Sequence, residues 1–361
     1  MSALRLEAGP PVRDALRRMR AYSLELNQAA TKIDQNENPL DFPEEWKAEV
    51  ARRAMARGWN RYPDFELRDL RLALASKYGF GIENILVGNG SNEMLFAVLA
   101  TFVDPGRGVF VLEPTFPLYE KIATIMGGDI ERIPFDPRLP AIVLGREVLE
   151  RIRRADRPVV VICSPNNPTG GVIDRTSLSE LLDSEATLLL DRAYGEFAGQ
   201  EHLPLHPRLI TFSTFSKAWG LAGLRIGWIA ATEQNCLEVR KVSLPYTLNV
   251  FSEEAALFAL EQSEAVSDRL RMLLEQRDWL NAELASIDGV EPFPSQANFI
   301  AFEVDEPVRV FRELISRSVL IRNISGYPGM QRALRVSVGT PEENRIFISA
   351  LRQSLSQRSQ S

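Results

Sequence analysis

Short apolar runs recur along the middle of the chain, and segments with helical spacing lie between most of them. The runs that predict strands are at residues 84–87, 109–112, 158–162, 187–190, 209–212 and 226–230. The segments that predict helices are at residues 91–102, 116–126, 146–154 and 176–183. Strands that are apolar on both faces and alternate with helices are typical of a mainly parallel sheet covered on both sides. The pattern therefore predicts an α/β fold.

The two ends of the chain have different patterns. Residues 12–20 predict a short helix, and helical spacing dominates residues 44–78 apart from the turn-forming stretch "GWNRYPD". After residue 233 the spacing is that of long helices, with an amphipathic run at 264–286. The tail reads as α+β, with helices at 307–317 and from residue 341 onward.

These patterns predict two domains. A large α/β domain would span residues 42–262, and a smaller α+β domain would span residues 263–361. The N-terminal arm, residues 1–41, would complete the smaller domain. Because ligands bind preferentially in clefts between domains, we expect the functional site there.

The composition excludes several classes of protein. The chain has 361 residues, of which 45% are hydrophobic, and a net charge of −6, values that are ordinary for a globular protein of one or two domains. No basic stretch is interleaved with aromatic residues, so we expect no nucleic-acid partner. With no signal peptide and no apolar run of 18 residues, we expect no membrane partner and a cytoplasmic location.

The cysteines and histidines give no sign of a metal site. Cys163 and Cys236 lack any CxxC or metal-ligand spacing, and Cys163 lies in the apolar run "VVVICS", so we expect buried free thiols. His202 and His206 fall in a polar segment that contains prolines. We expect them to be surface loop residues rather than a catalytic pair.

Candidate chemistry lies directly after the predicted strands, where ligands of doubly wound sheets bind. After "NILV" comes "GNGSNEMLF", in which glycines lead into a helix that begins near Ser91. The free N–H groups of a helix start favour a phosphate, although a plain turn capped by Ser91 would have the same sequence. After "VVVIC" comes "SPNNPTGG". This loop can hold an asparagine amide rigidly over a ligand, or it can simply turn the chain.

Two charged residues follow the next two strands. Asp191 ends the run "TLLLD", where a carboxylate is costly unless a cation pairs with it, the alternative being a helix cap. Lys217 lies in "STFSKAWGLAGLRIGW", eight residues before Arg225. Only six of the 42 Lys and Arg residues are lysines. A lysine at position 217 in a chain that otherwise prefers arginine therefore indicates a chemical need for an amine. A desolvated lysine can lose its proton and attack a carbonyl, whereas a surface lysine would form a salt bridge.

Together the four sites require one ligand with a phosphate, a group that pairs with Asp191 and a carbonyl for Lys217. Pyridoxal phosphate has all three. Asp191 would pair with its ring nitrogen, and Lys217 would form a Schiff base with its aldehyde. Its phosphate would be bound by the helix start and three further side chains, namely Gly90, Ser91, Asn92, Thr214, Ser216 and Arg225.

The chain resembles the fold-type I (class I and II) aminotransferases over essentially its whole length. "TFSKAWGLAG" is similar to their lysine signature, and "SPNNPTG", "DRAYGEF" and the Lys-to-Arg spacing belong to the same pattern. Within this group the chain is most similar to histidinol-phosphate aminotransferases. That similarity rests on "DQNENPLDFP", "NRYPDFELRDLRLALASKYG", "GNGSNE" and "RNISGYPGMQRALRVSVGTPEEN".

The resemblance implies roles for the matching cofactor-site residues. Lys217 would hold the cofactor and then act as general base and acid in the proton shift. Asp191 would bind the pyridine nitrogen, and Tyr194 and Asn167 would hydrogen-bond the ring O3′. Phe116, in "PTFPLY", would stack on the ring.

The resemblance also implies a substrate site and a partner. Arg335 would clamp the substrate α-carboxylate, with Asn167 beside it. Arg322 and Tyr22 would contact a distal phosphate of the substrate. Tyr62 would reach the phosphate of the partner subunit's cofactor, which makes a homodimer part of the active site.

The leading hypothesis is transamination between histidinol phosphate and 2-oxoglutarate in histidine biosynthesis, by a ping-pong mechanism. A threonine-phosphate decarboxylase-like lyase would keep fold and cofactor but break a different bond at the substrate Cα. An aromatic amino-acid aminotransferase is the third hypothesis, since Arg322 need not be reserved for phosphate. A catalytically idle cofactor-sensing domain predicts a DNA-binding appendage or a missing lysine, and this chain has neither.

Overall fold

The computed structural model describes residues 12–17, 19, 21, 29–199 and 202–356. Within them, a central seven-stranded sheet has the strand order β2-β10-β9-β8-β6-β3-β4. All neighbouring strands are parallel except at β10, which is antiparallel to both of its neighbours. In that order the strands span Ile85–Gly88, Gly227–Ala230, Leu209–Thr214, Thr187–Asp191, Val159–Cys163, Gly108–Glu113 and Asp129–Pro134. The prediction of a mainly parallel sheet is confirmed.

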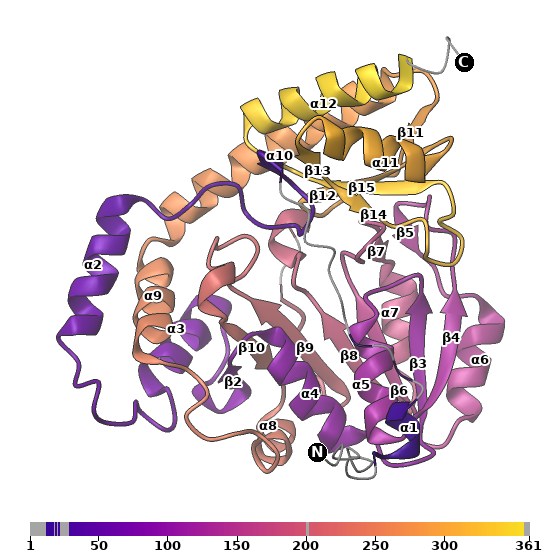
Figure 1. Cartoon of the computed structure of the whole chain (residues 1–361). Coiled ribbons are helices and arrows are strands. Elements are labelled where there is room, and N and C mark those ends of the chain that lie inside the picture. The colour runs from indigo at the N-terminus through magenta and orange to yellow at the C-terminus, as the bar shows by residue number, and fades with distance from the viewer. Residues whose placement is uncertain (1–11, 18, 20, 22–28, 200–201, 357–361) are drawn as a thin grey trace, which may run out of the picture.

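Helices cover both faces of this sheet (Figure 1). The covering helices that alternate with the strands are α4 (Ser91–Phe102), α5 (Leu118–Met126), α6 (Arg146–Arg154) and α7 (Arg175–Leu182). In β6, Val159 and Val161 enter the core shared with α4 and α5, whereas Val160 and Ile162 enter the core shared with α6 and α7. Because both faces are buried, the strand sequence is an unbroken apolar run.

Among the same residues, a smaller antiparallel sheet has four strands in the order β11-β12-β15-β14. These strands span Val290–Pro292, Phe299–Val304, Ala333–Ser337 and Arg322–Asn323. The helices that share its core are α10 (Ser263–Ala285), α11 (Pro307–Ser316) and α12 (Pro341–Ser356). Near the N-terminus, β1 (Thr31–Lys32) pairs in parallel with β13 (Val319–Leu320), so this segment joins the smaller-sheet part of the fold. The expected domain boundaries, at residues 42 and 262, stay a prediction.

The remaining elements frame these two sheets. The helices are α1 (Asp14–Arg17), α2 (Glu44–Met55), α3 (Arg68–Tyr78), α8 (Glu233–Arg240) and α9 (Val250–Glu261). The short strands β5 (Ala141–Ile142) and β7 (Val172–Ile173) pair with each other, and the 3-10 turns are η1 (Ile82–Asn84), η2 (Gly195–Ala198) and η3 (Ala222–Leu224). The helix α9 packs against α2 and α3, and all three helices contribute residues to the hydrophobic core of the large sheet.

The His202 side chain is packed against other rings rather than free at the surface. Its imidazole lies against the rings of Tyr78 and Trp228, with centroid distances of 4.4 Å and 5.1 Å. Burial among these rings, with Arg192 nearby, lowers the pKa of His202 to about 3. The expectation of a surface imidazole is therefore wrong for His202, because its partners come from α3 and β10, far away in the sequence. The expectation of buried free thiols is confirmed for both cysteines.

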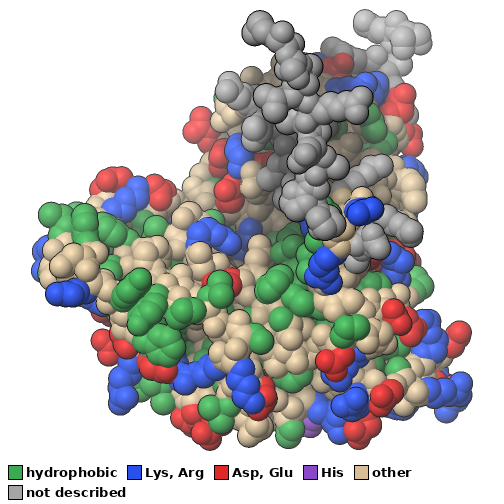
Figure 2. Space-filling view, turned by 60° about the horizontal axis from the view of Figure 1, so that its bottom comes forward, with side chains coloured by type: hydrophobic (Ala, Val, Ile, Leu, Met, Phe, Trp, Pro, Cys, Tyr) green, Lys and Arg blue, Asp and Glu red, His purple; other side chains and the backbone are tan. Residues whose placement is uncertain are grey.

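Hydrophobic side chains gather on the side of the molecule that carries α2 and α3 (Figure 2). The exposed aromatic residues there include Trp59, Tyr62 and Phe65. Tyr62 is 78% exposed and stacks on Tyr246 with a centroid distance of 4.3 Å, while Trp59 lies against Phe251. Large exposed apolar patches on soluble proteins often serve as contact surfaces. Of the helices that the structure describes, none is long and apolar enough to cross a membrane.

Candidate active site

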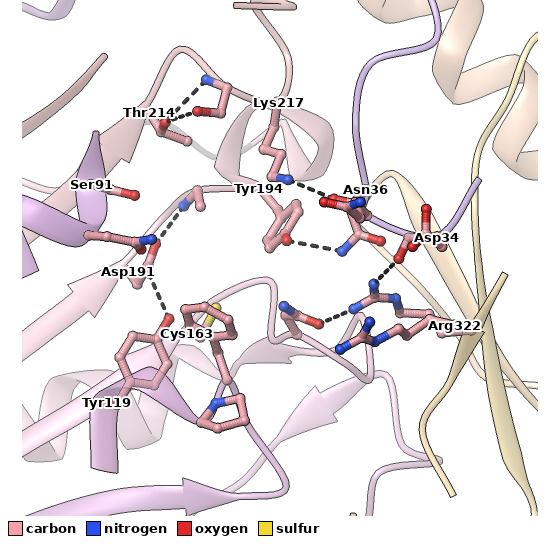
Figure 3. Close-up of a pocket in the computed structure, with 18 of the residues that line it drawn as sticks. Asp34, Asn36, Ser91, Tyr119, Cys163, Asp191, Tyr194, Thr214, Lys217 and Arg322 are labelled. Carbon is pink, nitrogen blue, oxygen red and sulfur yellow. Dashed lines mark hydrogen bonds between the residues drawn. The ribbon is translucent and has the colours of Figure 1, made fainter. Parts of the chain in front are cut away.

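A cavity of about 270 Å³ is lined by residues of both sheets and by the N-terminal segment at 34–36. It opens at the edge where the parallel strands of the large sheet have their carboxyl ends, as expected for this type of sheet. Figure 3 shows side chains from these separate segments pointing toward one another. The predicted residues that line this cavity are Ser91, Asn92, Phe116, Asn167, Asp191, Tyr194, Thr214, Ser216, Lys217, Arg225, Arg322 and Arg335.

Of the predicted residues that the structure describes, two do not line it. Gly90 directly precedes Ser91, and a Cβ added to it would lie 2.6 Å from Arg225 Nη2, so Gly90 lies next to two lining residues. Tyr62 lies away from this cavity, in the exposed aromatic cluster beside α3. Tyr22 lies outside the described residues.

Lys217 occupies the turn that follows β9. Its Nζ donates a 2.9 Å hydrogen bond to the carbonyl of Gln35, which holds the amine at the cavity wall. Desolvation, reinforced by the positive charge of Arg335, lowers the pKa of Lys217 to about 8. A minority of this amine is therefore neutral near physiological pH, and this form can act as a nucleophile or general base.

Asp191 ends β8 and is held on both of its oxygens. The Tyr119 phenol donates to Oδ2 at 2.6 Å, and the Ala193 N–H donates to Oδ1 at 2.8 Å. Burial raises the pKa of Asp191, while these donors and the positive Lys217 oppose that change. The carboxylate therefore faces the cavity in a fixed orientation, ready to pair with a cationic group.

The start of α4 and the turn after β9 form a candidate anion site. Gly90 has a φ of 85°, and an added Cβ there would lie 2.6 Å from Arg225 Nη2. At Gly227 an added Cβ would lie 2.1 Å from the Ser91 nitrogen, so only glycine lets β10 pass this close to the helix start. Thr214 and Ser216 hydroxyls hydrogen-bond each other at 2.9 Å and lie beside Arg225. Backbone N–H groups, hydroxyls and a guanidinium are the donor set that a phosphate needs.

The opposite wall carries two arginines on neighbouring strands. Arg322 in β14 and Arg335 in β15 are direct cross-strand partners. Arg335 donates to the side-chain oxygen of Asn167 and to the carbonyl of Asp34, and its Nε is buried without a hydrogen-bond partner among the described residues. Desolvation lowers the pKa of Arg335, and the charge of Arg322 adds to the effect. Two adjacent guanidiniums favour anionic ligands.

Several cavity residues were not predicted individually from the sequence. Tyr119 lies in the first turn of α5, and the predicted Phe116 lies two residues before that helix begins, so its position three residues after Phe116 is the signal that could have identified it. Asn36 donates a 3.0 Å hydrogen bond to the Tyr194 phenol. It has a left-handed φ of 54°, which its local sequence does not reveal. Within the described residues, no group of three or more His, Cys, Asp or Glu side chains could hold a metal ion.

A buried lysine with a lowered pKa, an oriented carboxylate at the neighbouring strand end and a glycine-led helix start therefore meet in one cavity, an arrangement that fits the family to which the sequence belongs. The chain belongs to the aminotransferase class I and II family, whose model matches residues 29–351. It is similar to the histidinol-phosphate aminotransferase of Chlorobium phaeovibrioides. The two are 37% identical over 343 residues, which cover 93% of this chain and 95% of that protein.

Two solved structures share the fold. One is histidinol-phosphate aminotransferase from Sinorhizobium meliloti in complex with pyridoxal-5'-phosphate, with a TM-score of 0.86, 23% identity and coverage of 98% of this chain and 99% of that one. The other is L-threonine-O-3-phosphate decarboxylase from Porphyromonas gingivalis, with a TM-score of 0.77, 24% identity and coverage of 90% and 99%. At these identities the likeness concerns the fold alone.

Proposed function

We propose that this protein is a pyridoxal 5′-phosphate-dependent aminotransferase that exchanges an amino group between histidinol phosphate and 2-oxoglutarate in histidine biosynthesis. The observation that carries the proposal is the meeting of Lys217, Asp191 and the anion site in one cavity, opposite a pair of arginines. The 37% identity to a histidinol-phosphate aminotransferase over 93% of the chain supports the choice of substrate. A cytoplasmic location stays a prediction.

Each part of the cofactor would have its own protein partners. The start of α4 would bind the phosphate together with nearby polar and basic side chains, namely Ser91, Asn92, Thr214, Ser216 and Arg225. Asp191 would accept a hydrogen bond from the ring nitrogen, and Phe116 would cover a ring face. Tyr194 and Asn167 would hydrogen-bond the ring O3′. When bound, pyridoxal phosphate supplies an aldehyde for amino groups and a ring that takes up the electron pair released at the substrate Cα.

Lys217 would perform the proton transfer. Because its pKa is about 8, Nζ can accept a proton from the substrate Cα near neutral pH and later return one. The hydrogen bond to Gln35 keeps Nζ at the wall of the cavity rather than in bulk water. The neighbouring Tyr194 phenol stays protonated, because burial raises its pKa, and can donate to an anionic oxygen.

The two arginines would bind the substrates in turn. Glutamate carries two carboxylates, whereas histidinol phosphate carries a phosphate and no carboxylate. We assign the glutamate α-carboxylate to Arg335 and the phosphate of histidinol phosphate to Arg322, with Tyr22 beside it. Because the guanidiniums lie on adjacent strands, one anion-binding wall can serve both halves of a ping-pong cycle.

A half-reaction panel tests this function. Wild-type enzyme loaded with pyridoxal phosphate is mixed separately with histidinol phosphate, phenylalanine and threonine phosphate, and absorbance follows the formation of pyridoxamine phosphate. Histidinol phosphate is expected to react fastest. A faster reaction with phenylalanine would favour an aromatic aminotransferase, and carbon dioxide release from threonine phosphate would favour the lyase. A wild-type protein that takes up no pyridoxal phosphate would refute the proposal.

The distal site has a separate test. Arg322→Ala is expected to weaken the reaction of histidinol phosphate by on the order of 2–5 kcal/mol and that of phenylalanine much less. Arg332→Ala is the matched control, because Arg332 pairs with Asp305 and does not line the cavity. Equal losses for both substrates would remove Arg322 from the phosphate site.

We also propose that the protein is a homodimer, with Tyr62 of each subunit reaching the cofactor phosphate of its partner. The exposed aromatic residues beside α3 support a contact surface there. Mixed dimers test it: Lys217→Ala and Tyr62→Ala subunits are each expected to be poorly active alone. A mixture should regain one intact site per mixed dimer if Tyr62 acts on the other subunit. No recovery in verified mixed dimers would contradict that arrangement.

A further inference from the structure

The Tyr119 phenol is the side chain that orients Asp191. It comes from the first turn of α5 and donates to Asp191 Oδ2 at 2.6 Å, while the Ala193 N–H occupies Oδ1 at 2.8 Å (Figure 3). Because the donors approach different oxygens, they fix the plane of the carboxylate. A hydrogen bond to an ionised acceptor is among the stronger polar contacts in a protein.

The surroundings of Asp191 make this donor important. The titratable groups that face the carboxylate are Tyr119 from α5, Cys163 from β6, Tyr194 from the turn after β8 and Lys217 from the turn after β9. Burial raises the pKa of Asp191, and the Tyr119 hydrogen bond is the largest influence that lowers it. Cys163 and Tyr194 keep their protons because burial raises their own pKa values. Tyr119 is therefore the main group that favours the ionised carboxylate.

The phenol cannot easily leave this position. Tyr119 is only 1% exposed, and its ring packs edge-on against Phe116 at 5.7 Å and 82°. Its hydroxyl also contacts Cys163, whose backbone pairs with that of Asp191 in the sheet. The ring thus supports Phe116 and the hydroxyl supports Asp191, so one side chain links two of the groups proposed to hold the cofactor.

We propose that Tyr119 is a positioning residue that keeps the Asp191 carboxylate ionised and turned toward the place of the cofactor's ring nitrogen. Tyr119 acts through Asp191 and does not itself bind the ring nitrogen. This inference rests on the proposed function, since it concerns how the chain holds pyridoxal phosphate.

Tyr119→Phe tests the proposal, because it removes only the hydroxyl and keeps the ring against Phe116. Cofactor-free protein is titrated with pyridoxal phosphate across acid and neutral pH, and the dissociation constant is measured at each pH. The variant is expected to bind roughly 10- to 100-fold more weakly near neutral pH. Without the phenol, Asp191 takes up its proton at a higher pH, so the acid loss of binding should begin at a higher pH than in the wild type.

Tyr78→Phe is the matched control, since Tyr78 is a packed tyrosine outside the cavity. It should bind the cofactor like the wild type at every pH. If Tyr119→Phe also binds like the wild type, or melts earlier with an unchanged pH profile, Tyr119 is merely structural and the inference is wrong. Failure of the wild type itself to bind would instead refute the proposed function.

Two further measurements sharpen the result. In an Asp191→Asn background, Tyr119→Phe should have little additional effect, because the proposal routes its action through the carboxylate. A full effect in that background would overturn it. If Tyr119→Phe does not fold, infrared difference spectra of the wild type against Asp191→Asn report the state of the carboxyl directly. An ionised carboxylate at neutral pH is expected, and a protonated acid would overturn the proposal.

Discussion

Replacing Lys217 with methionine should make the cofactor-free protein more stable near neutral pH. Desolvation, together with the charges of Arg335 and Arg225, lowers the pKa of the amine from 10.5 to about 8. In the unfolded chain the pKa returns to its ordinary value. As the pH falls between those values, the unfolded chain gains a proton that the folded protein does not accept, and stability is lost. Below pH 8 the loss is complete.

The magnitude follows from the two pKa values. The difference between 10.5 and about 8 corresponds to about 3 kcal/mol, as an upper limit because the amine borders an open cavity. Methionine also loses the 2.9 Å hydrogen bond to Gln35, which contributes about 1 kcal/mol. The expected net gain is therefore ~2 kcal/mol at pH 7. It should shrink as the pH rises above 8 and become a small loss once both states hold a neutral lysine.

Urea unfolding of the cofactor-free proteins between neutral and alkaline pH measures this gain. Lys241→Met is the matched control, because Lys241 is an exposed lysine that caps α8 and pairs with Glu238 in the last turn of that helix. That control should change stability little and without a comparable pH dependence. A gain for Lys217→Met that is the same at every pH would refute the reasoning, as would a wild type that is more stable at pH 7.

Two further predictions concern other parts of the fold. Gly227→Ala is expected to abolish cofactor binding, because the added Cβ would lie 2.1 Å from the Ser91 nitrogen at the helix start; titration with pyridoxal phosphate measures it. His202→Leu is expected to make the free energy of unfolding depend less on pH below neutral. The pKa of His202 is about 3 in the folded protein against 6.5 ordinarily, so the wild type loses stability as the pH falls from 6.5. Unfolding midpoints measured between neutral and acid pH should fall less in the variant than in the wild type. An equal dependence of the midpoint on pH in both proteins would contradict the prediction.

The apolar pattern predicts the centre of the large sheet better than its edge. All five residues of β6 are buried, so its sequence is an unbroken apolar run. The strand β4 was not predicted, because it is an edge strand that pairs only with β3. Most of its residues are at least partly exposed, and its sequence "DIERIP" is correspondingly polar. A strand that buries little of its surface leaves little trace in the hydrophobic pattern.

The cavity residues likewise divide into those that the sequence predicted and those that it did not. Lys217 and Asp191 were predicted because parallel strands bring their carboxyl ends to one edge. Tyr119 and Asn36 were not, since their partners lie 72 and 158 positions away in the chain. Tyr119 also sits in a segment whose spacing is that of an ordinary buried helix. Such contacts arise from tertiary packing, and of these two residues only Tyr119 has a local signal, its position three residues after Phe116.

The charge of the cavity connects the reactive lysine to the choice of ligand. Among the described residues, those of basic type that line it are Lys217, Arg225, Arg322 and Arg335, against the carboxylates of Asp34 and Asp191. Arg225 helps to lower the pKa of Lys217, and Arg322 does the same to Arg335. A phosphate beside Arg225 and a second anion beside Arg322 would relieve both repulsions. The arrangement that keeps Lys217 partly neutral in the free protein therefore also favours an anionic cofactor and an anionic substrate.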